Sequence, residues 1–581
     1  MSINRKLSTQ FDTIASVLEV MGANAFKINA NRRVARIIKE YPTDLSEFAG
    51  DKKGLTSIEG IGSGSADRIL EYIDTGQINE LTQLASEIPE GLIDLLEVPG
   101  LGPKTVRRFW QEAEVTSLDE LRKAISDGRL ESLPRFGTKK IENISDSLAF
   151  MEASGDRMRL GTALPIAESL IETLLQVPGT RKIEYAGSLR RGRETIGDID
   201  LLAVSDDPDA LAEAFTTGPD VIKILAQGKT KCSVRLERGV QIDLRIIEDS
   251  AFGAALMYFT GSKEHNVELR ERAIKAGQRL NEYGLFPDDG GEGTPQSRGI
   301  KPVASRTEED IYQALELPWQ PPELREQRDS VEDPPPPLVT TDAIRAELHA
   351  HTNASDGVMT LRELVEQAKS RGFHTIAVTD HSKSSGQANG LSPDRLRAHI
   401  DAIHEINDEI KGIRVLAGSE VDILADGRLD YDDELLARLD IVVASPHAAL
   451  TQDSKKATSR LLAAIEHPLV HIIGHPTGRI INKREGILPD MPRLFESAVE
   501  HDTVMEINAN PLRLDLRDTH VRLAVEMGCQ IAINTDAHRP EDFDLLRYGI
   551  LTARRGRLGP KQCINAWTAT KLHSWLAGKR S

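Results

Sequence analysis

Residues 185–202 read YAGSLRRGRETIGDIDLL, and this stretch sets the interpretation of the first half of the 581-residue chain. Side chains two apart on a strand point to the same face. Asp198 and Asp200 should therefore project together, while Ile199 and Leu201 face the core. Two adjacent carboxylates repel each other unless cations lie between them. The stretch predicts a metal-holding strand that follows a turn at Gly187.

A third acid, Asp243, lies among apolar neighbours in the strand pattern QIDLR at residues 241–245. If the two strands are neighbours, three carboxylates converge, which is the arrangement that holds two Mg²⁺ or Mn²⁺ ions about 4 Å apart for phosphoryl transfer. Gly187 and Ser188 would then hold nucleotide phosphates, with Arg191 as a cationic clamp. The same core also fits a nucleotidyltransferase that uses no template.

The whole string resembles the palm of family X DNA polymerases, the relatives of DNA polymerase beta, and YFTGSKEHN at residues 258–266 resembles the start of that family's thumb. The resemblance implies that Asp198, Asp200 and Asp243 are catalytic metal ligands. It implies a set of nucleotide contacts: Gly187, Ser188, Arg191, Tyr258, Phe259, Gly261, Lys263, His265 and Asn266. Tyr258 and Phe259 would line the sugar pocket, and Asn266 would face the base edge.

Three glycine turns, at residues 58–62, 98–102 and 133–137, precede helical patterns in the first 150 residues. Such a turn presents backbone N–H groups at a helix N-terminus and can bind a DNA phosphate without a basic side chain. One turn alone would equally well join two packed helices, but three resemble helix-hairpin-helix motifs. The DNA-binding positions they imply are Gly60, Gly62, Gly100, Gly102, Lys104, Gly137 and Lys139, with Arg107, Arg108 and Lys140 nearby.

Some family X members carry a lyase that forms a Schiff base through a lysine on the helix after the first turn. This reaction needs a primary amine, and the helix after Gly62 reads SGSADR, without a lysine. Arg68 cannot replace the amine, so we expect weak or absent deoxyribose-phosphate lyase activity.

A proline-rich stretch at residues 318–342 predicts an extended spacer. Beyond it, strand and helix patterns alternate. Seven strands are expected, near residues 345–350, 374–379, 414–420, 440–444, 469–473, 503–508 and 530–535, with helices such as 360–371, 394–410 and 518–528 between them. The alternation favours a closed barrel of parallel strands, with an open doubly wound sheet as the alternative.

Histidines and acids follow the ends of six of these strands, where a parallel barrel builds its sites. They are His349, His351, Asp356, His381, Glu420, His447, His475, Asp536 and His538. Imidazole combined with carboxylate suits Zn²⁺, Mn²⁺ or Fe²⁺. Glu506, Asn508 and residues 513–516 are expected to contact substrate on the same rim. The remaining candidates are interpreted as structural: His374, His404, His467, His471 and His520.

The strings ELHAHTNASDG, TDHS, GSEVD, SPHA, IGHP and NTDAH resemble the PHP (polymerase and histidinol phosphatase) family over residues 343–575. The resemblance implies a distorted (β/α)7 barrel with three metal ions that activate water against a phosphoester. It assigns His349, His351, Glu420 and Asp536 to one ion, Glu420, His447 and His475 to a second, and Asp356, His381 and His538 to a third. Because all nine ligands are present, we expect an active site.

Composition limits the remaining possibilities. No apolar run is long enough to span a membrane, and three distant cysteines predict a cytoplasmic protein without a disulfide framework. The net charge of −18 by itself argues against a nucleic-acid binder, but acids that hold metals contribute to it.

The expected domains are an N-terminal helical domain (1–90), fingers with further hairpins (91–155), a palm (156–250), a thumb (251–317), a proline-rich linker (318–342) and a PHP barrel (343–581). We expect a monomeric base-excision-repair enzyme that fills gapped or nicked DNA from deoxynucleoside triphosphates. Its barrel would be a 3′→5′ exonuclease, with AP endonuclease or 3′-phosphatase activity at the same rim. In two alternatives the barrel is a silent structural module or a fused small-molecule phosphatase.

Overall fold

The computed structural model describes residues 3–41, 44–89, 91–96, 98, 101–131, 133–134, 136–137, 140–142, 144–145, 148, 157–236, 239–326 and 330–579. The chain divides into two compact units, Met1–Gly155 with Asn482–Arg484, and Asp156–Ile481 with Glu485–Ser581. Among the described residues, none of the helices has the length and apolar character needed to span a membrane.

The first unit is helical. Its helices are α1 (Asn4–Met21), α2 (Ala25–Glu40), α3 (Lys52–Ser57), α4 (Ser63–Thr75), α5 (Asn79–Ser86), α6 (Gly91–Leu96), α7 (Pro103–Ala113) and α8 (Leu118–Ser126). The apolar face of α1, including Phe11 and Ile14, is fully buried in one core with residues from the later helices. The first glycine turn joins α3 to α4, and the second lies between α6 and α7, so both predicted hairpins connect pairs of helices.

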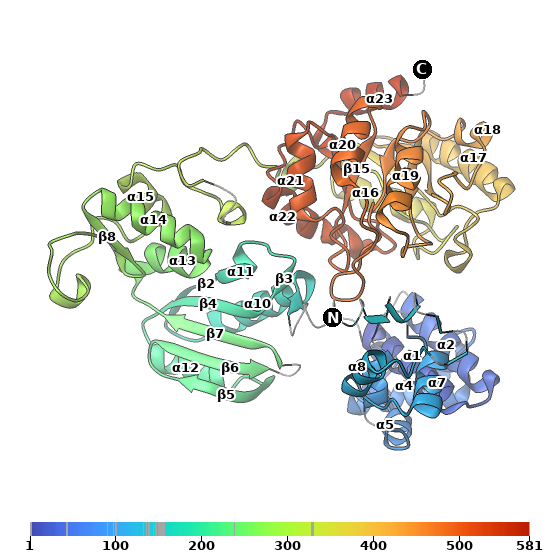
Figure 1. The fold of residues 1–581 in the computed structure, drawn as a ribbon, viewed down its shortest axis with the longest axis horizontal. Helices are drawn as coiled ribbons and strands as arrows, with labels where there is room; N and C mark the ends of the chain where they lie inside the picture. The colour runs from blue at the N-terminus through green and yellow to red at the C-terminus, as the bar shows by residue number, and fades with distance from the viewer. Residues whose placement is uncertain are drawn as a thin grey trace. The chain divides into compact units, whose positions relative to one another are not determined.

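A five-stranded sheet begins the second unit (Figure 1). Its order is β2 (Thr180–Tyr185), β4 (Asp198–Ser205), β7 (Gln241–Ile246), β6 (Lys231–Leu236) and β5 (Val221–Gln227). Strands β4 and β7 are parallel and pair Asp200 with Asp243, whereas the other neighbours are antiparallel. The expected adjacency of the two acidic strands is confirmed. Helices α10 (Leu160–Leu175) and α12 (Pro208–Thr216) pack on this sheet in a shared core with Ile199 and Leu201.

The next elements are α13 (Phe252–Thr260), α14 (Lys263–Lys275), β8 (Gln278–Asn281), β9 (Gly284–Pro287) and α15 (Glu308–Ala314). Arg325 packs against them. It is fully buried and donates two hydrogen bonds, of 2.6 and 2.9 Å, to the carboxylate of Glu308. A buried guanidinium needs such a partner. The predicted spacer is therefore wrong for residues 318–326, which pack here, while residues 334–337 form neither helix nor strand.

Seven parallel strands follow in chain order, each paired with the next. They are β10 (Ala346–Glu347), β11 (Thr375–Val378), β12 (Arg414–Asp422), β13 (Ile441–Ser445), β14 (Ile472–Ile473), β15 (Val504–Asn508) and β16 (Ile531–Asn534). A further parallel bridge between Ala350 and Ala537 joins the ends of the first and last strands. The barrel is nearly closed, which confirms the predicted barrel and excludes the open sheet.

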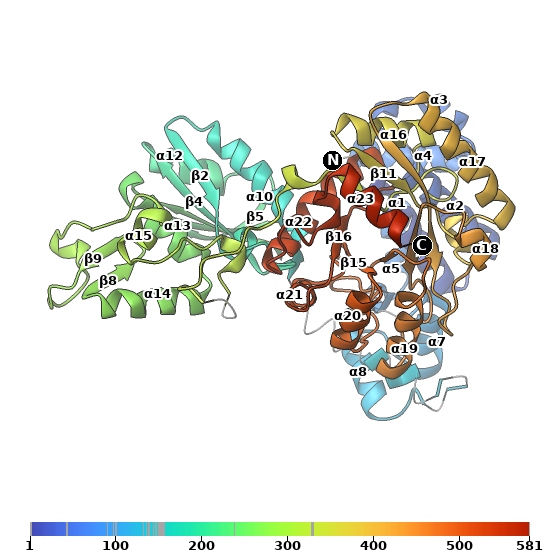
Figure 2. The same ribbon diagram turned by 90° about the horizontal axis from the view of Figure 1, so that it is seen from above.

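Helices surround these strands in Figure 2. They are α16 (Leu361–Ser370), α17 (Pro393–Glu409), α18 (Asp433–Leu436), α19 (Ser454–Ile465), α20 (Met491–Glu500), α21 (Asp518–Glu526) and α22 (Leu546–Arg555). The C-terminal helix α23 (Ala569–Gly578) packs Leu572 and Leu576 against barrel residues such as Leu416 and Val443.

Ion pairs join the barrel to the sheet and to the elements after it within the second unit. Arg479 donates hydrogen bonds of 2.6 and 3.1 Å to Glu194. Arg554 on α22 donates one of 2.6 Å to Glu323. Apolar contacts accompany these pairs, because Leu514 and Tyr548 of the barrel belong to the same core cluster as the sheet.

Candidate metal centres

The carboxylate of Glu420, near the end of β12, lies at the centre of the barrel rim. Five imidazoles contact it: His381 Nδ1 at 2.8 Å, His475 Nε2 at 2.8 Å, His447 Nε2 at 3.1 Å, His349 Nε2 at 3.4 Å and His351 Nε2 at 3.7 Å. Burial alone would raise the pKa of Glu420, but the His447, His381 and His349 imidazoles hold it well below its usual value. Glu420 is therefore a negatively charged carboxylate that lies between imidazoles from several strands.

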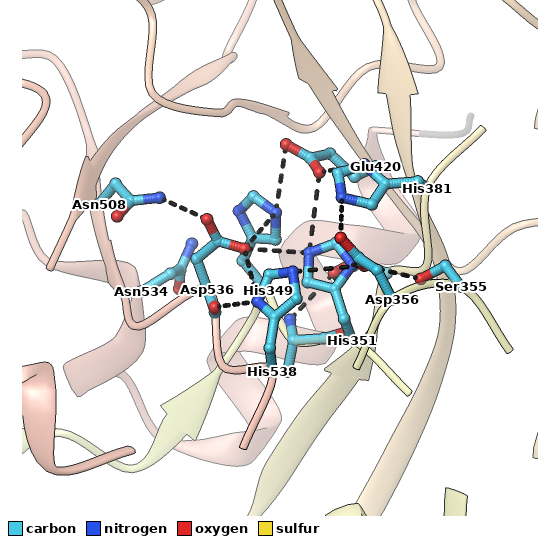
Figure 3. A network of polar contacts seen from close by, with 12 residues as sticks. His349, His351, Ser355, Asp356, His381, Glu420, Asn508, Asn534, Asp536 and His538 are labelled. Carbon is cyan, nitrogen blue, oxygen red and sulfur yellow. Dashed lines mark hydrogen bonds and ion pairs between the residues drawn. The ribbon is translucent and has the colours of Figure 1, made fainter. Parts of the chain in front are cut away.

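Two further acids complete the rim (Figure 3). Asp536 Oδ1 lies 3.0 Å from His351 Nε2, and Asp356 Oδ1 lies 3.3 Å from His538 Nε2. Asp536 adopts a φ of 54°, a left-handed conformation that non-glycine residues adopt mainly at functional sites. The structure thus gathers all nine predicted ligands at one rim, although they start from strands more than 180 residues apart along the chain.

The donor atoms of this rim fit metal ions. Within the described part of the chain, Nδ1 of His351 and Nδ1 of His475 are buried without a hydrogen-bond partner. Such atoms are costly unless something binds them. Three groups of ligand atoms lie close enough to share an ion: His351, Asp356, His381 and His538; His349, His351 and Asp536; and His381, Glu420 and His447.

Buried acids hold the outer nitrogens of two ligand rings. Glu506 Oε1 lies 2.7 Å from His349 Nδ1, and Asp422 Oδ1 lies 2.8 Å from His447 Nδ1. Such contacts fix the tautomer and the orientation of a metal-binding imidazole. Asp422 was not predicted, although it lies two residues after Glu420 on the same strand, and this spacing is the signal that could have found it.

The expected substrate contacts on this rim remain a prediction. Glu506 and Asn508 are fully buried, and Asn508 donates a 3.0 Å hydrogen bond to Asp536, so both residues of β15 contact predicted metal ligands. Leu514, Asp515 and Leu516 are fully buried as well. His374 is structural as predicted, since its ring contacts Thr375 and the carbonyl of Trp567.

The three palm acids form the second candidate centre. Asp198 and Asp200 lie on β4, and Asp243 is the register partner of Asp200 on β7. Burial and the neighbouring carboxylates of Asp198 and Asp243 raise the pKa of Asp200 to about 7, as expected for like charges at close range. Gly187 has a φ of 60°, and a Cβ there would lie 2.3 Å from Oδ2 of Asp200. Only glycine lets the turn approach this carboxylate.

A cleft of about 530 Å³ opens beside these acids, within the size range of small-molecule sites. Its lining contains most of the predicted residues: Gly187, Ser188, Arg191, Asp198, Asp200, Tyr258, Phe259, Gly261, Lys263 and Asn266. It also contains three arginines that were not predicted, Arg157, Arg193 and Arg270. Arg193 lies inside the quoted string, so its charge was a usable signal.

His265 is the predicted nucleotide contact that the structure contradicts. Its ring is 2% exposed, and Nε2 lies 2.6 Å from the hydroxyl of Tyr312. Burial lowers the pKa of His265 to about 3, so it is a neutral core residue on α14. Asn266, the next residue, lines the cleft and donates a 2.6 Å hydrogen bond to the carbonyl of Tyr258.

The hairpin turns of the first unit present backbone at helix starts. Gly62 and Gly102 are the extended residues that precede α4 and α7, and the side chain of Lys104 is 87% exposed. Gly60 has a φ of 91°, and a Cβ there would lie 2.5 Å from Cδ1 of Ile37. Gly137 is described, whereas Gly100 and Lys139 lie outside the described residues.

Arg68, the residue at the lysine position of the lyase, is held by the protein itself. It donates hydrogen bonds of 2.7 Å each to Asn31 and Glu80, and its guanidinium lies 4.8 Å from the ring centroid of Phe11. These contacts indicate a packing role for this side chain.

Four protein-family descriptions match the chain: Helix-hairpin-helix domain over residues 2–78, SAM-like Helix-hairpin-helix tandem over 92–149, DNA polymerase beta thumb over 255–326, and PHP domain over 347–508. The DNA polymerase/3'-5' exonuclease PolX of Bacillus subtilis is 38% identical over 569 residues, which cover 97% of this chain and 98% of that protein. The chain belongs to the family X DNA polymerases with a C-terminal PHP domain.

More distant relatives resemble parts of this family X polymerase. DNA polymerase lambda of Rattus norvegicus is 23% identical over 349 residues, which cover 56% of each protein. The probable phosphatase TTE1963 of Caldanaerobacter subterraneus is 30% identical over 201 residues, which cover 33% of this chain and 74% of that protein. The thumb match ends at residue 326, in agreement with the packing of Arg325.

Proposed function

We propose that this family X polymerase fills short gaps in DNA by template-directed synthesis in its palm and removes nucleotides from DNA 3′ ends in its barrel. One observation carries the proposal: the chain combines an acid trio beside a nucleotide-sized cleft with a rim that brings together all nine predicted ligands. The relative from Bacillus subtilis bears the name of both activities.

In the palm, Asp198, Asp200 and Asp243 would hold two Mg²⁺ or Mn²⁺ ions, which supply the charge that activates a primer hydroxyl and stabilises the leaving phosphates. The positive side chains of the cleft would orient the triphosphate. Arg191, Arg193, Lys263 and Arg270 are the candidates because they line it. Tyr258 and Phe259, with ring centroids 5.1 Å apart, would pack against the sugar.

In the barrel, the nine rim residues would hold Mn²⁺, Zn²⁺ or Fe²⁺ ions, which supply an activated water for phosphoester hydrolysis. Glu506 and Asp422 keep the rings of His349 and His447 in place through their Nδ1 atoms. The same rim could serve related reactions at abasic sites or 3′-phosphates.

The alternatives are less well supported. A barrel with only a structural role gives no reason for buried ring nitrogens without hydrogen-bond partners, such as Nδ1 of His351 and Nδ1 of His475. A small-molecule phosphatase has a precedent in the name of the relative TTE1963. A phosphatase that acts on small molecules would not need the two helix-hairpin-helix regions that this chain also contains.

We further propose that the chain acts as a monomer on gapped or nicked DNA. Its domains would be an N-terminal helical domain (1–90), fingers (91–155), a palm (156–250), a thumb, a linker and a PHP barrel (343–581). The thumb would extend to residue 326 because of the buried ion pair of Arg325 with Glu308.

One assay on gapped DNA with Mn²⁺ and deoxynucleoside triphosphates tests the proposal. Asp198→Ala should abolish extension of the primer and leave degradation intact. His349→Ala should abolish degradation and leave extension intact. Unchanged degradation by His349→Ala would favour the silent barrel, and incorporation that ignores the templating base would favour an untemplated nucleotidyltransferase. Faster hydrolysis of a phosphomonoester metabolite than of a DNA 3′ end would favour the phosphatase.

The lyase is expected to be weak or absent, because Arg68 offers no primary amine. Borohydride trapping on incised abasic DNA measures this directly. A covalent adduct with this chain would contradict the expectation.

A further inference from the structure

Glu326, the last residue of the thumb, lies at the junction of the nucleotide cleft and the barrel. Its carboxylate contacts three arginines: Arg191 Nε at 3.1 Å, Arg193 Nη1 at 3.7 Å and Arg555 Nη1 at 3.0 Å. Arg191 and Arg193 line the cleft, whereas Arg555 ends helix α22 of the barrel. One carboxylate therefore neutralises cations that belong to two different domains.

The Arg191 guanidinium is held by two partners in the described structure, Glu326 and Thr260. Besides the pair with Glu326, it donates a 2.5 Å hydrogen bond to the carbonyl of Thr260. Its side chain is 11% exposed, and that of Glu326 is 13% exposed. Pairs as little exposed as this one are screened less by water than surface pairs. A triphosphate that needs Arg191 must therefore compete with Glu326.

We infer that Glu326 is a built-in counter-ion for the nucleotide cleft, which holds Arg191 until a triphosphate replaces it. The inference rests on the proposed polymerase function. It adds a residue that sets nucleotide affinity through Arg191. Phosphate oxygens carry more charge than one carboxylate and accept the same guanidinium hydrogen bonds, so the exchange is chemically matched.

Arg555 gives the barrel a part in this exchange. It donates hydrogen bonds to Glu326 at 3.0 Å, to the backbone carbonyl of Arg191 at 2.8 Å and to Asp518 at 2.9 Å. Once Arg191 turns to a nucleotide, Glu326 keeps Arg555 as a partner and is not left as a buried unpaired charge. The barrel thus lowers the cost of releasing Arg191.

Electrostatics within the cluster agree with this arrangement. Burial alone would raise the pKa of Glu326, but Arg555, Arg191 and Arg193 together hold it below its usual value. The carboxylate therefore stays charged near neutral pH, which the exchange requires.

The test measures binding of the α,β-imido analogue of dTTP, with Mg²⁺, to the full-length chain on gapped DNA with a templating dA. Glu326→Gln removes the competing charge and should lower the Kd about fivefold, with the rate constant of dTTP incorporation within about twofold of wild type. The matched control is Glu323→Gln, which breaks the neighbouring pair with Arg554 but does not touch Arg191. It should leave the Kd unchanged.

A second variant tests the role of the barrel. Arg555→Met leaves Glu326 to the cleft arginines and should raise the Kd about threefold, and Glu326→Gln in the same chain should abolish that increase. An unchanged or higher Kd for Glu326→Gln, the same change in the Glu323→Gln control, or an Arg555→Met effect that persists in the double variant would each overturn the inference. A wild-type chain that neither binds the analogue nor extends a primer would instead refute the proposed function.

Discussion

The two candidate metal centres of this chain are built in opposite ways. The palm centre consists of three carboxylates on two neighbouring strands beside an open cleft, and two of them lie two residues apart. The rim of the barrel uses six histidines and three acids from six strand ends, most of them buried and in contact with one another.

This difference in ligand chemistry bears on how each centre would hold its ions. Burial and the neighbouring carboxylates raise the pKa of Asp200 to about 7, so the palm acids suit ions that arrive with a charged nucleotide. The rim pairs acids with imidazoles and orients them through buried partners such as Glu506, so it is preorganised for resident ions. All-oxygen ligands suit Mg²⁺, whereas imidazole suits transition metals.

The largest expected effect on activity comes from a change of Glu420 at the centre of the rim. Glu420→Ala removes the carboxylate that contacts five imidazoles, and exonuclease activity should fall about a thousandfold because the charge stabilisation from the ions is lost. Gap filling by the same preparation should stay within about twofold of wild type. Time courses on a 3′-labelled primer measure the loss. Equal losses of both activities would break the distinction between the centres.

Removal of metal should separate the two centres next. After chelation, the midpoint temperature of unfolding should fall, because ions whose free concentration is about a thousand times their Kd stabilise the folded chain by about 4 kcal/mol. Asp198→Ala, which removes a predicted palm ligand, should show the same fall as wild type, since the palm ions would arrive with substrate, whereas His349→Ala should show a smaller one. Calorimetry before and after chelation, with Mn²⁺ added back, measures the shift in each chain. A smaller fall in Asp198→Ala than in wild type would show that the palm ions are resident too.

A smaller effect is expected one layer behind the rim. Glu506→Gln keeps the shape but weakens the acceptor for His349 Nδ1, and Mn²⁺ affinity should fall about 10- to 100-fold. Glu496→Gln, an exposed change on α20, serves as the control and should leave affinity unaltered. Mn²⁺ titration followed by electron paramagnetic resonance gives the values. Affinity equal to that of the control would mean that Glu506 does not orient the ring.

The smallest effect is expected behind the palm acids. Gln241 donates a 3.1 Å hydrogen bond to Asp243, but the contact is only partly buried. Gln241→Leu should therefore slow nucleotide incorporation about threefold, in line with one neutral hydrogen bond. Single-turnover extension at saturating Mg²⁺ measures it. A loss of a hundredfold or more would mean that the palm is as preorganised as the rim.

Local patterns were enough to predict the strands and the side chains that gather at the rim. Runs such as residues 441–444 are apolar throughout, as buried parallel strands require, and rim residues such as His381 and Glu420 follow or lie near the ends of their strands. The acids 198 and 200 were predictable for the same reason, because alternation along one strand needs no knowledge of distant residues.

What failed depends on partners far away in the chain. His265 resembled a cleft residue, but its ring is buried in the core, where it forms a hydrogen bond with the hydroxyl of Tyr312. Residues 318–326 resembled a spacer in the sequence, but Arg325 pairs with Glu308 and this segment is packed against the protein. The roles of Glu506 and Asp422 were harder to predict, because each contacts a ring nitrogen that comes from another strand. Asp422 left a local signal in its two-residue spacing from Glu420, whereas the contact of Glu506 with His349 left none.

The bond between Arg479 and Glu194 has a consequence for protein engineering. Arg479 stands four residues after the ligand His475, and Glu194 stands four residues before Asp198. A chimaera that takes its synthetic half from one relative and its degrading half from another would inherit only one member of this pair. Such hybrids should work best when both positions are exchanged together.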